Sequence, residues 1–424
     1  MLRGLSLAYY YGAPLMNDLL IINAKIWTLD EQGTLEKGWL TAKNGLISGI
    51  GFGNPPNEVM GEVSIDAQRS NLLPGLVDCH THLLEYATSA VHNTQDKAQE
   101  MAAIANLLDA MKCGIVATGE HHLGHPILGL KMDDYKRLIN FTPMSSSIAF
   151  GCCWIGVEPK ILTSCTRPGK VFVKDCLTDD EYKQMALSSE FAGENIFLNY
   201  TSANVPIDKT PHAGEITYNK NKLQRIIDIF HKEGKAIGAH IEGDESARLF
   251  IECGGNVIHH GFGLSPELGT IMAEKSVPLV ITPSGGTLKN PTSPQEVYGF
   301  YQQGVFLALA SDSYIPLHPR AEEIPLPPGY FTGPKEFLKV CSATLRYFTS
   351  QGVSTEDALK LITVNGRKLI KPHEPAATLN IGHAADLILC DHLPALETVE
   401  PEDIKVVIIA GKIQVDKRVN ADKT

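Results

Sequence analysis

The stretch LLPGLVDCHTH, at residues 72–82, decides how the whole chain is interpreted. Its apolar run suits a strand that is buried on both faces, as the strands of parallel sheets are. The run ends in His80 and His82, which lie two residues apart and therefore point to the same side of a strand. Two imidazoles that face one spot are a natural start for a divalent metal site.

Strand-like and helix-like segments alternate after this first strand. Further apolar runs suit buried strands at 114–122, 143–154, 194–200, 235–243, 256–261, 277–284 and 305–313. Helical patterns lie between them, at about 97–112, 126–140, 178–192, 220–234, 244–254, 265–275 and 291–303. Eight strands that alternate with helices predict an α/β protein with a (β/α)8 TIM barrel. A doubly wound sheet, the alternative, would need a Gly-rich turn where the chain has Asp-Cys-His-Thr-His.

Both ends of the chain read as short β-strands separated by turns. The segment 18–72 contains the pair Asn44-Gly45, a strong signal for a hairpin. The last part holds two β-branched runs, ADLILCD at 385–391 and IKVVIIAGKIQVD at 404–416. Neither end is large enough to bury much core alone. We therefore expect one small β-sandwich domain built from both termini, residues 1–72 plus 378–424, and a barrel catalytic domain at 73–377.

Later strands end in further imidazole or carboxylate groups. His240 ends the fifth strand, the pair His259-His260 ends the sixth, and Asp312 ends the eighth. The carboxyl ends of barrel strands meet at one mouth, so these side chains are expected to lie near the histidines of the first strand. Together they predict a metal site.

Four segments resemble the amidohydrolase superfamily of metal-dependent barrel hydrolases, and the resemblance spans almost the whole chain. The segment AHIEGDESARLFIECGGNVIHHGFGLSPE, at 239–267, is most similar to the imidazolonepropionase-like and prolidase-like branches. The other three are LPGLVDCHTH (73–82), LALASDS (307–313) and TLNIGHAADLILCD (378–391).

The resemblance implies a role for each polar strand end. His80, His82 and His240 would bind the metal ion, and Asp312 would be a further ligand and the general base. This chemistry is physically sound, because a divalent ion lowers the pKa of its water from 15.7 towards about 7. A neighbouring carboxylate can then pass the released proton to a leaving nitrogen.

The pair His259-His260 offers one more functional imidazole. Strand alternation allows only one of the two to point into the barrel mouth. The family pattern places that imidazole directly before a glycine, which selects His260. It would be a second-metal ligand or the residue that polarises or protonates the substrate, and His259 would face a helix as a structural residue.

The fourth strand departs from the pattern of the binuclear members. Those members bridge two ions with a carboxylated lysine, or sometimes a glutamate, at the end of this strand. Residues 196–200 contain no lysine, and Lys174 is the nearest alternative. We therefore expect one divalent ion per chain, with zinc favoured by a nitrogen-rich site and iron or manganese also chemically reasonable.

The fifth strand departs from the pattern of the deaminase-like members. Those members usually carry a glutamate three residues after the histidine, and this position is Gly243 here. Glu242 lies two residues after His240, shares its strand face and is a candidate proton shuttle. A solvated loop position for Glu242 remains the alternative.

Three residues near strand ends are candidates for substrate binding. His122 follows the second strand, Trp154 ends the third and Tyr200 ends the fourth. Local hydrogen bonding is the alternative role for His122, and packing against a helix is the alternative for Trp154. Cys79 lies between Asp78 and His80 and is expected to point away from the metal and pack in the core.

Composition excludes several other classes of protein. The formal net charge is −11 and no basic run occurs, which argues against nucleic acid and anionic membranes as partners. The nine cysteines include no Cys-x-x-Cys and suit reduced thiols in a cytoplasmic protein. No uncharged apolar run reaches the roughly 18 residues of a membrane span. The expected partner is a small-molecule substrate, and the family resemblance favours a homo-oligomer, a dimer or higher.

We therefore expect a hydrolase of carbon–nitrogen bonds other than peptide bonds, acting on a cyclic amide, an amide or an amidine with metal-activated hydroxide. Two alternatives are a heterocycle deaminase that releases ammonia with Glu242 as proton shuttle, and a prolidase-like dipeptidase. The missing strand-four lysine counts against the dipeptidase. A non-catalytic metal-binding barrel would show the loss of a ligand position, and none of the expected positions is lost.

Overall fold

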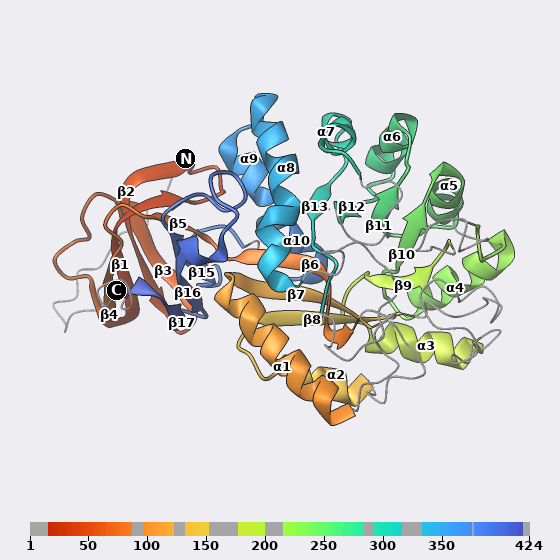
Figure 1. Ribbon diagram of the computed structural model, residues 1–424, viewed down its shortest axis with the longest axis horizontal. Coiled ribbons are helices and arrows are strands. Elements are labelled where there is room, and N and C mark those ends of the chain that lie inside the picture. Colours follow the sequence, from red (N-terminus) through yellow and green to blue (C-terminus); the bar gives the residue numbers. More distant parts are fainter. Residues whose placement is uncertain are drawn as a thin grey trace, which may run out of the picture.

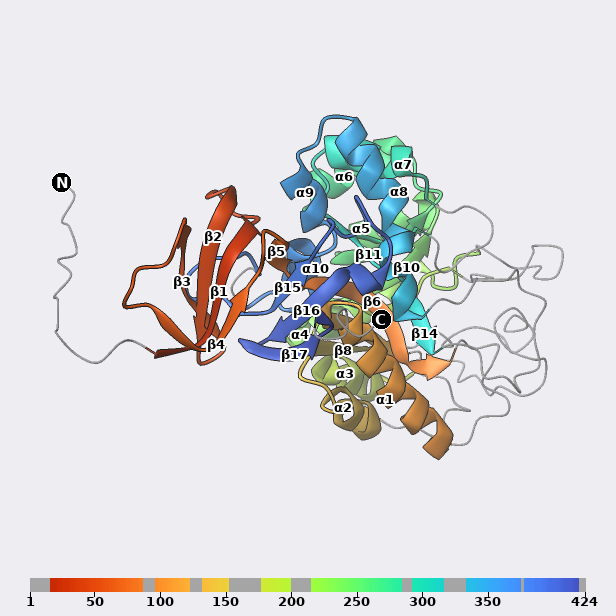
Figure 2. The same ribbon diagram turned by 60° about the vertical axis from the view of Figure 1, so that its left-hand side comes forward.

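The computed structural model describes residues 16–86, 96–122, 132–151, 177–199, 215–283, 292–315, 333–374 and 377–418. Its strands gather in two parts: a β-rich part at one end of the molecule, and an α/β part whose helices lie outside its strands (Figure 1). The two parts remain distinct in the turned view (Figure 2). The chain thus has a TIM-barrel-type fold with a β-rich domain, as the sequence predicts.

The strands of the α/β part are parallel and follow one another in chain order. Hydrogen bonds join them in two sheets, of order β14-β6-β7-β8 and β13-β12-β11-β10-β9. Most residues of these strands are buried, because helices cover the outer face of a parallel sheet. Their bounds are β6 (Leu76–Tyr86), β7 (Ile115–His122), β8 (Ser145–Phe150), β9 (Glu194–Phe197), β10 (Gly238–Glu242), β11 (Val257–Phe262), β12 (Leu279–Ile281), β13 (Leu307–Leu309) and β14 (Ser313–Ile315).

Polar side chains connect the two sheets at both of their edges. Asn195 on β9 donates its Nδ2–H to the carbonyl of Phe150 on β8, at 2.9 Å. At the other edge, the N–H of Ser311, just after β13, donates to Oδ1 of Asp78 on β6, also at 2.9 Å. The edges of each sheet therefore find polar partners on the other sheet.

The helices between Asp96 and Gln302 lie where the sequence patterns place them, most of their ends within a few residues, whereas the three helices between 337 and 370 have no counterpart among those patterns. Capping explains two of their starts: Thr178 and Glu181 form a capping box before α3, and Ser293 and Glu296 form one before α7. The bounds are α1 (Asp96–Lys112), α2 (Met132–Ile139), α3 (Asp179–Ser188), α4 (Lys220–Lys232), α5 (Asp244–Glu252), α6 (Pro266–Glu274), α7 (Pro294–Gln302), α8 (Phe337–Ser350), α9 (Thr355–Lys360) and α10 (Val364–Ile370), with short 3-10 turns η3 (Pro334–Glu336) and η4 (Pro401–Asp403).

The β-rich part combines strands from both ends of the chain in one branched sheet. Its order is β17-β16-β15-β5-β1-β2-β3, and β4 pairs with the first half of β1. Hydrogen bonds therefore join these strands in a single sheet, not in the two separate sheets of an ordinary sandwich. The limits expected for the two domains stay a prediction. The strands are β1 (Met16–Trp27), β2 (Thr34–Lys43), β3 (Leu46–Phe52), β4 (Met60–Asp66), β5 (Asn71–Pro74), β15 (Leu387–Cys390), β16 (Ile404–Ile409) and β17 (Lys412–Asp416).

Two tight turns fix the register of this sheet. Asn44 and Gly45 join β2 to β3 with φ of 52° and 81°, so the hairpin predicted from this pair is confirmed. The run 404–416 is a second hairpin, β16 and β17, and not a single strand. Ala410 and Gly411 form its turn with φ of 49° and 71°.

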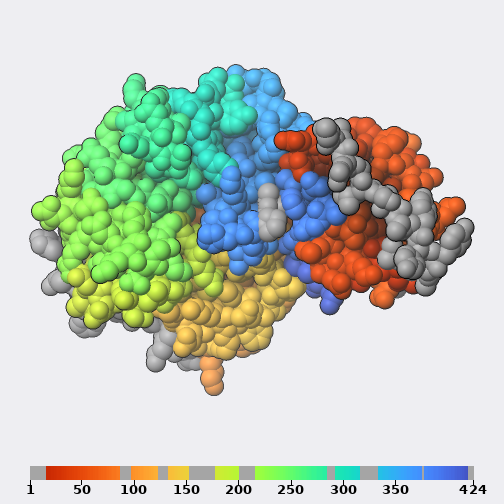
Figure 3. All heavy atoms as spheres, turned by 180° about the vertical axis from the view of Figure 1, so that it is seen from behind, coloured from red at the N-terminus to blue at the C-terminus, as the bar shows by residue number. Residues whose placement is uncertain are grey.

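Strands β15 and β16 are buried on both faces. Leu387 and Leu389 belong to the core of the β-rich part, whereas Ile388 and Cys390 belong to the large core of the α/β part. Successive side chains of a strand point to opposite faces, so a continuous apolar run serves two cores. In the space-filling view the C-terminal part of the chain accordingly lies between the N-terminal strands and the rest of the molecule (Figure 3).

No helix within the described ranges combines the length and the apolar character that crossing a membrane would require.

The backbone at Gly238, where β10 begins, leaves no room for a side chain. A Cβ atom there would lie 2.0 Å from the carbonyl oxygen of Gly193 and 2.8 Å from that of Ala192. We expect Gly238→Ala to lower the free energy of unfolding in urea by about 1–3 kcal/mol or more, because backbone atoms cannot move aside as a side chain can.

Gly299→Ala provides the matched control for this substitution. Gly299 lies in α7, and a Cβ atom there meets nothing within 4 Å. The added methyl group should raise stability by about 0.5–1 kcal/mol through better helix propensity. Equal effects of the two substitutions would contradict the tight approach of the chain at Gly238.

Candidate metal centre

Imidazole and carboxylate side chains from separate strands converge on one buried point. We call the six residues the Glu194 cluster, and each is at most 6% exposed. Strand β6 supplies two histidines, β9, β10 and β11 supply one residue each, and the turn between β13 and β14 supplies an aspartate. The members are His80, His82, Glu194, His240, His260 and Asp312.

One side of the cluster has the spacing of a tetrahedral metal site. Oε2 of Glu194 lies 3.1 Å from Nε2 of His80 and 3.8 Å from Nε2 of His82. Oδ1 of Asp312 lies 3.6 Å and 3.3 Å from the same two nitrogens. Ligands about 2.0–2.2 Å from a tetrahedral ion are separated by about 3.3–3.5 Å from one another. Each carboxylate oxygen therefore lies near both imidazole nitrogens; His80, His82 and Asp312 form one compact ligand group, and no such group of the described residues contains both carboxylates.

The other side of Glu194 faces the remaining two histidines. Its Oε1 accepts a hydrogen bond from Nδ1 of His240 at 2.9 Å and lies 3.5 Å from Nε2 of His260. Nδ1 of His260 in turn lies 2.7 Å from Oγ1 of Thr282. The ring of His240 stacks on Phe197, with ring centroids 4.6 Å apart. The rings are thus held in place by contacts on both sides.

Several polar atoms of the cluster are buried and have no hydrogen-bond partner among the described residues. Buried polar atoms in folded proteins nearly always have a partner, and a bare one costs about 1–3 kcal/mol. A cation bound among these atoms would satisfy most of them, so the donor set fits a divalent metal. The atoms are Nε2 of His80, His82, His240 and His260, and Oδ1 of Asp312.

The cluster keeps its two carboxylates ionised. Burial by itself would raise the pKa of Glu194, but the imidazoles of His260 and His240 bring that pKa well below its usual range. Burial likewise opposes the ionisation of Asp312, and contact with His82 outweighs it and lowers the pKa. Both side chains are therefore negative near neutral pH, as ligands of a cation must be.

Asp312 reaches the cluster through an unusual backbone conformation. Its φ of 57° lies in the left-handed region, which residues other than glycine seldom adopt. The conformation is held by the N–H of Asp312, which donates to the carbonyl of His80 at 3.0 Å. The strand-eight carboxylate is thereby fixed to the strand that carries the first two histidines.

The expectation that His259 faces a helix is wrong. Its Nδ1 lies 2.9 Å from Nδ1 of His80, and its Nε2 donates to the carbonyl of Ala192 at 3.0 Å. The alternation rule fails here because His260 and Gly261 both have a φ of 66°, so the strand is not extended at this point. Both histidines of the pair therefore lie inside the molecule.

The sequence pattern does not single out Glu194. The prediction for the fourth strand rests on 196–200, its end, whereas Glu194 begins β9. The available signal is a carboxylate at the head of an apolar run, since a glutamate is almost never fully buried without a partner. The lysine-free strand therefore still brings a carboxylate into the cluster.

His240, the third nitrogen ligand expected from the resemblance, has a different environment. Among the described residues it belongs to none of the ligand groups whose atoms lie within 4.8 Å of one another. Its Nδ1 is taken by Glu194, and its Nε2 faces Oε1 of Glu242 at 3.9 Å. The groups are His80-His82-Asp312, His80-Glu194-His260 and His80-His121-His259.

Glu242 lies at the end of β10 with 22% of its side chain exposed, so it reaches both His240 and solvent. Of the three candidates for substrate binding, His122 packs its ring against Tyr135 and Phe150, and burial lowers its pKa to about 4. Trp154, Tyr200 and Lys174 lie outside the described residues.

Two residues of β7, Glu120 and His121, lie next to the cluster and are not among the residues predicted for the site. His121 stacks on His80, with ring centroids 4.0 Å apart, and within the part of the chain that the structure describes neither of its buried ring nitrogens has a hydrogen-bond partner. Glu120 accepts from Oγ1 of Thr81 and from the N–H of Leu84. Burial raises the pKa of Glu120 to about 8.

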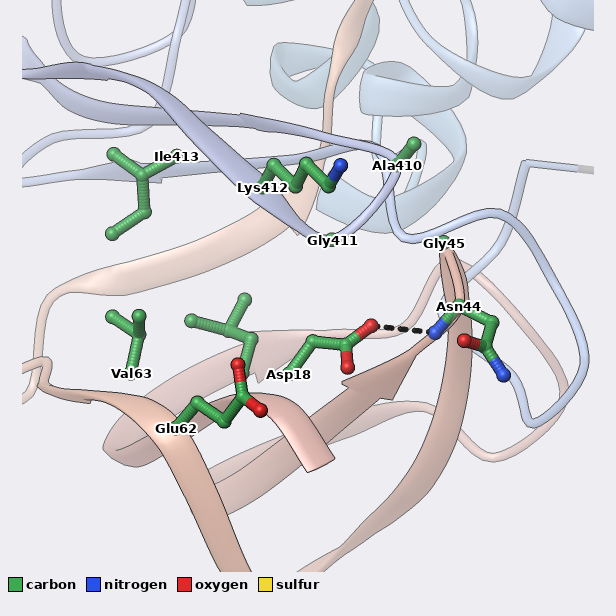
Figure 4. A pocket seen from close by; sticks show the side chains of 10 residues that line it. Asp18, Asn44, Gly45, Glu62, Val63, Ala410, Gly411, Lys412 and Ile413 are labelled. Carbon is green, nitrogen blue, oxygen red and sulfur yellow. Dashed lines mark hydrogen bonds between the residues drawn. The ribbon is translucent and has the colours of Figure 1, made fainter. Parts of the chain in front are cut away.

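A separate cavity of about 690 Å³ lies in the β-rich part, between the Asn44-Gly45 and Ala410-Gly411 turns. Figure 4 shows Asp18, Glu62 and Lys412 around it, with Asp18 accepting from the N–H of Asn44 at 2.6 Å. Its lining contains no histidine and no cysteine. The cavity is therefore distinct from the Glu194 cluster and lacks its chemistry.

Known proteins share this architecture. A prolidase crystallised with N-methylphosphonate-L-proline matches 94% of the chain and 99% of its own, with a TM-score of 0.70 and 15% identity. An adenosine deaminase from Xanthomonas campestris with bound zinc matches 96% and 94%, with a TM-score of 0.68 and 16% identity. At these identities the likeness concerns the fold.

Sequence comparison matches the family over a much longer part of the chain than it matches imidazolonepropionase. Imidazolonepropionase from Streptococcus pyogenes is 29% identical over 128 residues, which are 28% of this chain, and the match spans only 30% of the length of that enzyme. The amidohydrolase family, in contrast, matches residues 71–414, from the strand before the first histidines to the last hairpin. The chain belongs to the amidohydrolase family.

Proposed function

We propose that this chain is a metal-dependent hydrolase that cleaves a carbon–nitrogen bond other than a peptide bond in a small molecule: a cyclic amide, an amide or an amidine. The observation that carries the proposal is the set of buried nitrogen and oxygen atoms without hydrogen bonds in the Glu194 cluster. Family membership supports hydrolysis and a divalent ion.

Four residues would hold the ion: His80, His82, Glu194 and Asp312. One ion per chain is supported by the compact His80-His82-Asp312 group and by Oε2 of Glu194, which lies 3.1 Å and 3.8 Å from the nitrogens of the two histidines. Zinc is favoured because it takes nitrogen and oxygen ligands in tetrahedral sites. When bound, the ion would supply a water that is acidic enough to attack near neutral pH and would polarise the bond to be cleaved.

The protein's own residues would handle the protons. Asp312 has an ionised carboxylate, so its oxygen that does not bind the ion would accept the proton of the attacking water and pass it to the leaving nitrogen. His260 has an unpartnered Nε2 on the same side as His240 and would hold the substrate oxygen or nitrogen that gains charge.

A closed (β/α)8 barrel would bring all these strand ends to one mouth, and we propose it for the α/β part. The hydrogen bonds of Asn195 and Ser311 across the two edges support this closure. The strands also run in chain order around both sheets. The mouth of such a barrel is where its βα loops place a substrate.

A heterocycle deaminase is the second candidate function, and the position of Glu242 favours it. Oε1 of Glu242 lies 3.9 Å from Nε2 of His240, and the side chain is partly exposed. A carboxyl group there would shuttle a proton to a ring nitrogen, and the leaving group would be ammonia. Release of ammonia distinguishes this reaction from ring opening of a cyclic amide.

Metal analysis tests the proposed centre directly. We expect about one divalent ion per wild-type chain, and a loss of affinity of at least about 10–100-fold for Glu194→Gln and Asp312→Asn, because each removes a charged ligand. Elemental analysis after dialysis against a chelator series measures both quantities. Glu252→Gln removes an exposed carboxylate that pairs with Lys220 and should leave affinity unchanged.

Two other results would contradict the proposed centre. Two ions per wild-type chain would contradict the expectation of a single ion and would place the second ion in another of the ligand groups. Wild-type protein that retains no divalent ion, even after reconstitution with zinc, iron or manganese, would contradict the proposed function as a whole.

Glu242→Gln separates the two candidate reactions. If Glu242 is the proton shuttle, turnover of an ammonia-releasing substrate should fall by about 10²–10⁴-fold while metal content stays the same. The assay follows ammonia with heterocyclic amines and ring opening with cyclic amides, and it includes an Xaa-Pro dipeptide. Glu245→Gln changes an exposed carboxylate three residues along and should leave turnover intact. Unchanged turnover in Glu242→Gln would remove this residue from the mechanism.

A further inference from the structure

His80 and His82, the two histidines of β6, are held by different kinds of partner. Nδ1 of His82 donates directly to a backbone carbonyl, that of His121, at 2.8 Å. Nδ1 of His80 instead faces another imidazole, Nδ1 of His259, at 2.9 Å. His259 takes no direct part in the proposed reaction, although it is buried and lies against the proposed ligand His80.

The partners of His259 determine where the protons of this pair reside. Its Nε2 lies 3.0 Å from the carbonyl oxygen of Ala192, which can only accept, so Nε2 carries a hydrogen. In neutral imidazole the other nitrogen, Nδ1, then has a lone pair. Because Nδ1 of His80 lies at hydrogen-bond distance from that lone pair, it is the donor.

This assignment fixes the opposite nitrogen of His80 as well. With a hydrogen on Nδ1, neutral His80 has a lone pair on Nε2. This nitrogen lies 3.1 Å from Oε2 of Glu194 and 3.6 Å from Oδ1 of Asp312. A lone pair among carboxylate oxygens is unfavourable unless a cation lies between them. The ring of His80 is therefore prepared for metal binding by a group on its far side.

We propose that His259 is a positioning residue that holds His80 in the metal-binding tautomer. Its Nε2 donates to the carbonyl of Ala192, which leaves its Nδ1 free to accept a hydrogen bond from Nδ1 of His80. This inference rests on the proposed function, since it concerns the ion that the Glu194 cluster would bind. Ala192 lies two residues before Glu194, so the same short segment fixes one ligand directly and another through His259. Hydrogen bonds of this kind on the outer nitrogen of a ligating histidine fix its tautomer and raise its basicity.

His121 offers a matched control, because it touches the same ring without a hydrogen bond. The rings of His121 and His80 stack at 4.0 Å, and both nitrogens of His121 lack a partner among the described residues. His121→Leu therefore removes packing on His80 alone. His259→Leu removes packing and the hydrogen bond, and His259→Asn can place an amide oxygen near the former Nδ1 position.

The experiment measures zinc affinity of these variants by competition with a chromophoric chelator, beside the unfolding midpoint of each metal-free protein. We expect affinity to fall about 10–100-fold in His259→Leu and to stay within about threefold of wild type in His259→Asn and His121→Leu. Recovery in the Asn variant, at similar metal-free stability, is a result that a purely structural role would not give.

Three results would overturn the inference. The first is wild-type affinity in His259→Leu, and the second is an equal loss in His121→Leu, which would assign the effect to packing. The third is a second equivalent of zinc that wild-type protein binds and that both His259→Leu and His121→Leu lose. This result would mean that His80, His121 and His259 themselves hold an ion. In each of these cases wild-type protein still binds metal and the proposed function stands, whereas metal-free wild-type protein would overturn both.

Discussion

The burial of the Glu194 carboxylate is the constraint on which the rest of the α/β part depends. An ionised carboxylate in a dry interior is strongly unfavourable unless charged or hydrogen-bonding partners surround it. Here the partners come from different strands: His80 from β6, His240 from β10 and His260 from β11. The charge therefore requires the strand ends to meet, and their meeting creates a place for a cation.

The backbone provides this meeting by leaving the extended conformation at chosen points. His260 and Asp312 both have positive φ, with values of 66° and 57°. Each residue other than glycine in the left-handed region costs about 1–3 kcal/mol, and such residues persist where surrounding structure fixes them. In both cases the residue directs a side chain towards other members of the Glu194 cluster, so the strain is located where the chemistry is proposed.

Local sequence signals predicted much of this architecture, because they depend on neighbouring residues alone. The hairpin at Asn44-Gly45 follows from turn chemistry, and the shared direction of His80 and His82 follows from the strand period. Glu194 and His259 could not be placed in the same way. The position of Glu194 depends on imidazoles that are remote in the chain, and that of His259 depends on a local break in the strand that alternation does not foresee.

The β-rich sheet has a consequence for the biosynthesis of this protein. Asn71, the first residue of β5, donates to the carbonyl of Asp391, 320 residues further along the chain, and β5 also pairs with β15. Strands β1 to β5 pair with one another, but on a ribosome the second edge of β5 waits for β15 until nearly the whole chain has been made. Unpaired strand edges are prone to aggregate, and non-local pairing is slow. Vectorial synthesis would thus leave this edge of β5 in need of protection, by a chaperone or by nearby charged residues, until β15 emerges.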